Sequence, residues 1–319
     1  MTYSIVARDP QSGLLGVAVQ TAMLAVGSTV PWARAGVGAI ATQAIAEPAY
    51  GTRCLDALQA GASAQAALDQ AITADQAALL RQVGVVAADG RAAAFTGEWC
   101  IDQAGHVVGD GFAVQANMMA SPDVWPAMAA AYGSVARPAA EPGLSRPGGG
   151  DRAHGEAAWP FARRLLAVLE AGQAAGGDAR GVMSAALVIV AGQPAEPWAG
   201  RLVDLRTDRS KDPLGELRRL LDAAEAYARF GSAVDALVGG DARAALDAAD
   251  RGLVLLPGEE NLRFIRSGAL MAAGDEEAGR AVLRALIDDR PSWAVVVRGF
   301  AAKGLLTLPA SALDVLQGP

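Results

Sequence analysis

Apolar residues alternate with small and polar ones in short runs over about the first two hundred residues, a pattern typical of β-strands. The first two runs are separated by the turn-forming residues 9–13, which predicts a hairpin at the start of the chain. Asp89-Gly90 predicts a second hairpin with a type I′ turn. The predicted strands are 3–7, 14–20, 36–43, 82–86, 92–96, 105–108, 111–115, 184–190 and 202–205.

Stretches of helical composition lie between these strands, and the helices they predict are 50–60, 64–73, 122–132 and 160–172. The segment from Pro138 to Gly150 is rich in proline and glycine and has little to bury, so we interpret it as a mobile surface loop. Two sets of strands with helices between them predict an α+β layered body that ends near Arg209.

Beyond Pro213 the pattern changes to helix only, and a repeat becomes visible. Gly240-Asp241 recurs as Gly274-Asp275, and Pro257 recurs as Pro291, each 34 residues further on. A glycine between two helices and a proline after the second resemble the tetratricopeptide repeat, although the large aromatic residue expected near the start of the first helix is not evident. An unrelated helical bundle is the alternative. The predicted domains are 1–209, a layered α+β domain, and 213–319, a tetratricopeptide-like all-α helical domain.

The composition excludes several classes of protein. Hydrophobic residues make up 52% and charged residues 19% of the 319 residues, which is typical of a folded globular chain. The net charge is −7, and no cluster of lysine and arginine is interleaved with aromatic residues, so nucleic acid is not an expected partner. The start lacks the pattern of a secretory signal, and no apolar run is long enough to cross a membrane. The expected location is therefore the cytoplasm.

Residues that usually carry cofactors or hydrolytic chemistry are scarce. Cys54 and Cys100 are too few for a disulfide framework and too far apart for a metal motif, so we expect buried thiols and predict no metal or other cofactor. His106 lies in a strand-like run, where we expect a structural role, and His154 lies beside the glycine-rich segment, where we expect a solvated loop. No common catalytic motif is present, so a mechanism without histidine is favoured.

Thr2 offers such a mechanism. Removal of Met1 by an aminopeptidase would leave Thr2 with a free α-amino group, whose unperturbed pKa of about 7.7–8.0 suits a general base near neutral pH. A threonine hydroxyl activated by the amine of the same residue is a known nucleophile. If Thr2 is considered without the rest of the chain, however, the simpler interpretation is that it is a polar residue that begins a strand.

The order of several short segments along the chain favours the nucleophile interpretation of Thr2. The segments are Thr2–Asp9, Leu15–Gln20, Ala25–Ser28, Val30–Ala39, Ala41–Gln43, Arg81–Val86, Ala94–Gly97 and Val114–Asn117. In this order they resemble a widespread prokaryotic family that is catalogued as domain of unknown function 1028 and assigned to the N-terminal-nucleophile (Ntn) hydrolase superfamily. The resemblance covers residues 2 to about 209, and the segment 138–150 looks like an insertion relative to compact members.

This resemblance implies a four-layer αββα sandwich with the N-terminal strand at its centre and its first residue facing a cleft. In that superfamily the N-terminal residue attacks an amide carbonyl, N–H groups hold the oxyanion, and water resolves the acyl-enzyme. The implied site residues are the nucleophile Thr2, a polarising group at Gln20 or Thr21, oxyanion donors at Gln43 or Ala44, and a further amide donor, Asn117. For the positions other than Thr2, plain strand-end or turn residues are the alternative.

Two functional hypotheses from different classes follow. The first is an Ntn-type amidohydrolase that cleaves the C–N amide bond of a small molecule or short acyl amide. The second is a catalytically silent protein of the same fold whose helical repeats recruit a partner. Two repeats bury little surface by themselves, so we expect them to pack on the first domain or on a second subunit, which predicts a homo-oligomer such as a dimer.

Overall fold

The computed structural model describes residues 2–134 and 152–303. The segment that we interpret as a surface loop, Pro138 to Gly150, lies outside the described residues. The chain divides into two compact units, Met1–Leu221 and Asp222–Pro319, and the division falls inside helix α6 (Pro213–Val238). The first unit therefore extends beyond Arg209, where the strand pattern ends.

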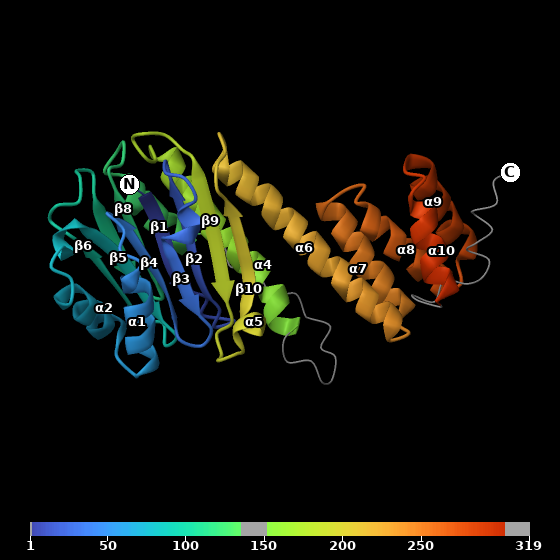
Figure 1. Cartoon of the computed structure of the whole chain (residues 1–319), viewed down its shortest axis with the longest axis horizontal. Helices are drawn as coiled ribbons and strands as arrows, with labels where there is room; N and C mark the ends of the chain where they lie inside the picture. The colour runs from blue at the N-terminus through green and yellow to red at the C-terminus, as the bar shows by residue number, and fades with distance from the viewer. Residues whose placement is uncertain (1, 135–151, 304–319) are drawn as a thin grey trace. The chain divides into compact units, whose positions relative to one another are not determined.

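The first unit contains two antiparallel sheets (Figure 1). Within the described residues, one sheet has six strands in the order β10-β9-β2-β1-β8-β7, and the other has four in the order β3-β4-β5-β6. Strand β1, which begins at Thr2, is therefore hydrogen-bonded on both sides. The strands are β1 (Thr2–Arg8), β2 (Leu15–Thr21), β3 (Pro31–Arg34), β4 (Gly38–Ala44), β5 (Arg81–Ala87), β6 (Ala92–Thr96), β7 (Gly105–Gly109), β8 (Phe112–Asn117), β9 (Ser184–Val190) and β10 (Arg201–Thr207).

Helices cover the outer face of each sheet. Helices α1 (Ala49–Gln59) and α2 (Ala64–Thr73) bury Tyr50 and Leu68 against the four-stranded sheet. Helices α3 (Val124–Ser134) and α4 (Arg152–Ala174) pack on the six-stranded sheet. Valines and alanines from both sheets fill the space between them. The mixed α+β class is thus confirmed, and the layers run helix, sheet, sheet, helix.

The second predicted hairpin forms, but its turn differs from the prediction. Val86 pairs with Ala92, and the N–H of Ala87 donates to the carbonyl of Arg91, which leaves a three-residue loop. Only Gly90 in this loop has a positive φ, 89°, whereas a type I′ turn requires two such residues. The type I′ prediction is wrong because the strand register leaves three residues in the loop and not two.

Two further elements differ from the sequence pattern. The predicted strand from Gly36 to Gln43 corresponds to β4, and a further short strand, β3, lies before it where the pattern predicts none. Helix α4 begins well before Pro160 and passes through it, although a proline inside a helix removes one backbone hydrogen bond. The backbone of His154 is consequently helical, and the prediction of a loop at this position is wrong.

The second unit is helical, and its repeat corresponds to a repeated helix boundary. The side chain of Asp241 accepts a hydrogen bond from the N–H of Ala244, and Asp275 accepts one from Ala278 in the same way. The glycine before each aspartate has a positive φ. Among the described residues, no helix is both long and apolar enough to cross a membrane. The remaining helices of this unit are α7 (Ala242–Leu255), α8 (Glu260–Ala272), α9 (Glu276–Asp289) and α10 (Trp293–Ala302), while the short helix α5 (Pro197–Gly200) belongs to the first unit.

Candidate functional site

A cluster of buried polar side chains lies between the two sheets at the end where β1 begins. Because side chains alternate along a strand, Thr2 and Ser4 of β1 both face the four-stranded sheet. Each member of the cluster is at most 4% exposed, and buried polar groups are tolerated only when they are hydrogen-bonded. This polar cluster consists of Thr2, Ser4, Thr21, Gln43, Gln82, Gln115 and Asn117.

Thr2 is held from both neighbouring strands and from the opposite sheet. The strand register pairs it with Thr21 of β2 and with Asn117 of β8. Its hydroxyl donates to Thr21 Oγ1 at 3.1 Å. Its carbonyl oxygen accepts from Gln43 Nε2 at 3.0 Å and from Asn117 Nδ2 at 3.3 Å. Both polar ends of the residue are therefore fixed in position.

Gln82 connects the amides that hold Thr2. Its Oε1 accepts from Gln43 Nε2 and from Asn117 Nδ2, both at 2.8 Å. Its Nε2 donates to the Ala116 carbonyl at 2.8 Å and to Thr96 Oγ1 at 2.9 Å. Such a shared network of buried amides restricts each side chain to one orientation.

Ser4 and Gln115 complete the network on the inner side. Gln115 Nε2 donates to Ser4 Oγ, and Ser4 Oγ donates to Gln43 Oε1, each at 2.6 Å. Gly84 of β5 lies opposite, and a Cβ atom there would be 2.2 Å from Gln115 Oε1. A residue without a side chain is thus required at position 84.

We expect Gly84→Ala to lower the free energy of unfolding by about 1–3 kcal/mol, as overpacking of a filled interior does. The added methyl group must displace Gln115 and with it the bond to Ser4. Thermal or urea unfolding measures the change. The control is Gly133→Ala in α3, where a Cβ meets nothing within 4 Å. An equal loss of stability in both variants contradicts the prediction.

The structure does not bring Gln20 to Thr2. Gln20 pairs with Tyr3 in the strand register, and both side chains lie on the helix-facing side of the sheet, where each bonds Gln173 of α4. Of the two residues expected to polarise the nucleophile, only Thr21 contacts Thr2. The family resemblance implied Gln20 or Thr21 for this role, and the register of β1 against β2 selects Thr21.

Gln43 and Asn117 do lie beside Thr2, but their amide N–H groups are directed at the carbonyl of Thr2 and at Gln82. In this arrangement they hold Thr2 in place. Sequence reasoning missed Ser4, Gln82 and Gln115. The available signal was a polar residue inside an otherwise apolar strand, which is rarely buried without a specific partner.

His106 lies at the outer end of the same network. Its Nδ1 is 2.8 Å from Thr96 Oγ1, which in turn accepts from Gln82. Although the residue is exposed, partial burial of its ring lowers the pKa of His106, so the imidazole is neutral near pH 7. This position agrees with the structural role expected from the sequence.

The cysteines are buried, as predicted, and burial raises the pKa of the Cys54 thiol to about 12. Burial also raises the pKa of Cys100. A thiol that stays protonated at neutral pH is a poor nucleophile and a poor metal ligand. Across the described residues, no group of three or more His, Cys, Asp or Glu side chains is placed to hold a metal ion.

Strained backbone is concentrated in the loops around the polar cluster. The described non-glycine residues with positive φ are Ala25 (54°), Ala44 (70°), Gln103 (57°) and Met118 (55°). Ala44 directly follows Gln43, and Met118 directly follows Asn117, at the ends of β4 and β8. Such conformations cost of order 1–3 kcal/mol each and tend to occur at functional sites.

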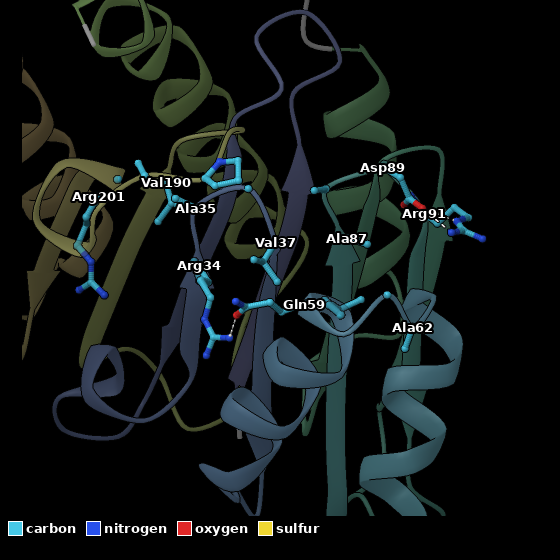
Figure 2. A pocket seen from close by; sticks show the side chains of 18 residues that line it. Arg34, Ala35, Val37, Gln59, Ala62, Ala87, Asp89, Arg91, Val190 and Arg201 are labelled. Carbon is cyan, nitrogen blue, oxygen red and sulfur yellow. Dashed lines mark hydrogen bonds and ion pairs between the residues drawn. The ribbon is translucent and has the colours of Figure 1, made fainter. Parts of the chain in front are cut away.

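The first unit also contains a pocket of about 740 Å³ at the opposite end of the strands, shown in Figure 2. Its arginines are each bound to neighbouring side chains: Arg34 to Asp56 and Gln59, Arg91 to Asp89, and Arg201 to Asp204. The positive charges in the pocket are therefore already neutralised. Because the pocket lies at the other end of the strands, it is separate from the polar cluster.

Fold and site together define a mixed α+β protein with two antiparallel sheets and a polar cluster at the start of an interior strand. Residues 2–217 match the model of the family described as "Family of unknown function (DUF1028)", and the chain belongs to this family. The crystal structure of a Silicibacter pomeroyi protein of the same family is similar, with 29% sequence identity and a TM-score of 0.55. The similarity covers 69% of this chain and 87% of that chain. A search of curated proteins found no match.

Proposed function

We propose that the protein is an N-terminal-nucleophile amidohydrolase. Removal of Met1 frees the α-amino group of Thr2, and the Thr2 hydroxyl then attacks an amide carbonyl. The observation that carries this proposal is the position of Thr2. It is the first residue of an interior strand, its hydroxyl is 3.1 Å from Thr21 Oγ1, and its carbonyl is bound by two side-chain amides. Fixed orientation of a nucleophile contributes strongly to rate.

In the proposed reaction, the free amine of Thr2 accepts the proton of the Thr2 hydroxyl as Oγ1 attacks the carbonyl carbon. The C–N bond then breaks, and the proton passes to the leaving amine. Water hydrolyses the resulting ester and restores the hydroxyl. Gln43 and Asn117 position Thr2, and the backbone N–H of Ala44 is the proposed oxyanion donor, because its strained conformation follows directly on Gln43.

The strained loops add support to this assignment. Backbone strain is retained only where the surrounding structure over-determines it, and here it occurs next to two residues that hold Thr2. The resemblance to the Ntn hydrolase superfamily and the four-layer arrangement agree with the proposal.

A catalytically silent protein of this fold is the second candidate, and the burial of Thr2 favours it. Thr2 is only 4% exposed, and the amide groups beside it already bond one another. In this alternative the polar cluster specifies the packing of the two sheets, and the helical unit recruits the partner.

Intact mass spectrometry combined with electrophilic labelling tests the proposal. We expect the purified protein to lack Met1 and to form a single adduct with a β-lactone, which peptide mapping locates on Thr2. The adduct is expected to disappear with Thr2→Ala. A protein that keeps Met1, or one that loses it and still gives no adduct, supports the silent alternative.

A further inference from the structure

An apolar rim surrounds the end of the sandwich where Thr2 lies. Among the residues of the first unit whose exposure the structure describes, the exposed large hydrophobic side chains lie at this end, in loops or in the short 3-10 helix η2 (Ala78–Leu80), apart from Val108 of β7. Soluble proteins rarely gather exposed apolar side chains without a ligand or partner. The apolar rim consists of Met23, Leu24, Ile45, Leu79, Trp99 and Ile101, which are between 38% and 63% exposed.

The first part of the rim is attached to strands that hold Thr2. Met23 and Leu24 follow β2, whose last residue, Thr21, bonds the Thr2 hydroxyl. Ile45 lies two residues after Gln43, whose amide bonds the Thr2 carbonyl. The rim therefore begins at two of the segments that position the candidate nucleophile.

Backbone hydrogen bonds connect the rest of the rim to these segments. The N–H of Ile45 donates to the Leu80 carbonyl at 3.2 Å, and the N–H of Trp99 donates to the Leu79 carbonyl at 2.9 Å. The N–H of Met118, the residue after Asn117, donates to the Ile101 carbonyl at 3.3 Å. Backbone hydrogen bonds thus connect the rim to segments of both sheets that flank the polar cluster.

The loops that carry the rim are held in place and do not fold over to bury its side chains. Arg81 is bound to Asp75 at 2.8 Å and also donates to the Ile45 carbonyl at 2.7 Å. The strained residues Ala25, Ala44 and Gln103 lie in or next to the same loops, and the strained Met118 bonds the carbonyl of Ile101. A binding surface that is rigid before its ligand arrives loses little entropy on binding.

The position of the rim favours an apolar ligand of the candidate site over a separate protein partner, because segments that carry it also hold Thr2. At roughly 30 Å² per methylene, an extended alkyl chain of about ten carbons has about 300 Å² of apolar surface to bury. Six large hydrophobic side chains that are between 38% and 63% exposed offer enough apolar surface to cover such a chain.

We propose that the apolar rim binds the long acyl chain of an N-acyl amide and delivers its carbonyl to Thr2. This inference rests on the proposed function for the chemistry but not for the binding. The substrate class that it assigns is an amide of a medium- or long-chain carboxylic acid.

Chain-length dependence tests the inference. A dansyl-labelled dodecanoyl amide and its acetyl counterpart, both below their micelle concentrations, are titrated against Thr2→Ala, and binding is followed by fluorescence anisotropy. We expect the dodecanoyl probe to bind at least tenfold more tightly, because each buried methylene contributes up to about fourfold. The double change Trp99→Ser and Leu24→Ser is expected to remove this preference. The control is Val108→Ser, which is expected to keep it.

Equal binding of the two probes overturns the inference, and so does a preference that survives the double change. A third outcome also overturns the inference: neither probe binds, the protein self-associates, and the double change abolishes this self-association. The rim is then a contact between copies of the chain. Labelling of wild-type Thr2 by an acetyl-sized and a decyl-substituted β-lactone separates the two proposals. If binding depends on chain length while neither lactone labels Thr2, the proposed function fails and the acyl-binding rim stands.

Discussion

Replacing Thr2 by alanine is expected to lower hydrolysis of an identified amide by a factor on the order of 10⁴ or more, because the nucleophile is deleted. Thr2→Ser keeps a hydroxyl beside the amine and is expected to retain reduced activity. Alanine and serine at this position both still permit removal of Met1. Steady-state kinetics on the three proteins measure the difference.

Stability provides the control for this comparison. Since the Thr2 hydroxyl donates to Thr21 in a buried site, Thr2→Ala is expected to lower the free energy of unfolding by about 1 kcal/mol. The loss is larger than for an exposed strand end but leaves the protein folded. Full turnover by Thr2→Ala contradicts the N-terminal-nucleophile mechanism.

Asp75→Ala is expected to cause the largest loss of stability, about 3 kcal/mol, because it leaves the guanidinium of Arg81 buried without its carboxylate. The two side chains are 12% and 11% exposed. Asp75 also accepts from the Ala77 N–H at 2.9 Å and from the Tyr50 hydroxyl at 3.2 Å. Chemical unfolding measures the loss. The control is Asp69→Ala at an exposed position of α2, which is expected to change stability by under about 0.5 kcal/mol.

The ion pair between Asp75 and Arg81 also makes the free energy of unfolding depend on pH. The bond from Arg81 holds the pKa of Asp75 below its usual value, so the folded state favours the ionised carboxylate. This contribution is complete above the unfolded pKa of about 3.9 and is lost as the pH falls through the folded pKa. Below pH 4 we therefore expect wild type to lose more stability than Asp75→Asn does. Parallel curves for the two proteins contradict this assignment.

Sequence patterns were sufficient to predict most strands, because short apolar runs bounded by turn residues, as in β1 and β2, are typical of strands buried on both faces. They missed β3, whose four residues are all only partly buried and show no clear alternation. They also began α4 too late, because a proline such as Pro160 usually marks a helix start. The boundaries that failed are those where tertiary packing overrides local preference.

The candidate site was only partly predictable for a similar reason. Thr2 and Thr21 meet because the two strands pair in one register, and a shift of one residue would bring Gln20 to the site instead. Register depends on the whole hairpin and not on the residues at its end. Ser4, Gln82 and Gln115 join the cluster through contacts across two sheets, which no local pattern encodes.

The interior position of β1 restricts how the protein can be handled. With Thr21 on one side and Asn117 on the other, the start of this strand has no freedom to move aside. Under the proposed mechanism, an affinity tag or fluorescent protein fused ahead of Thr2 replaces the free amine by a peptide bond. Such a fusion is expected to fold and yet remain inert, so that genetic screens of this family that rely on N-terminal tags would overlook its activity.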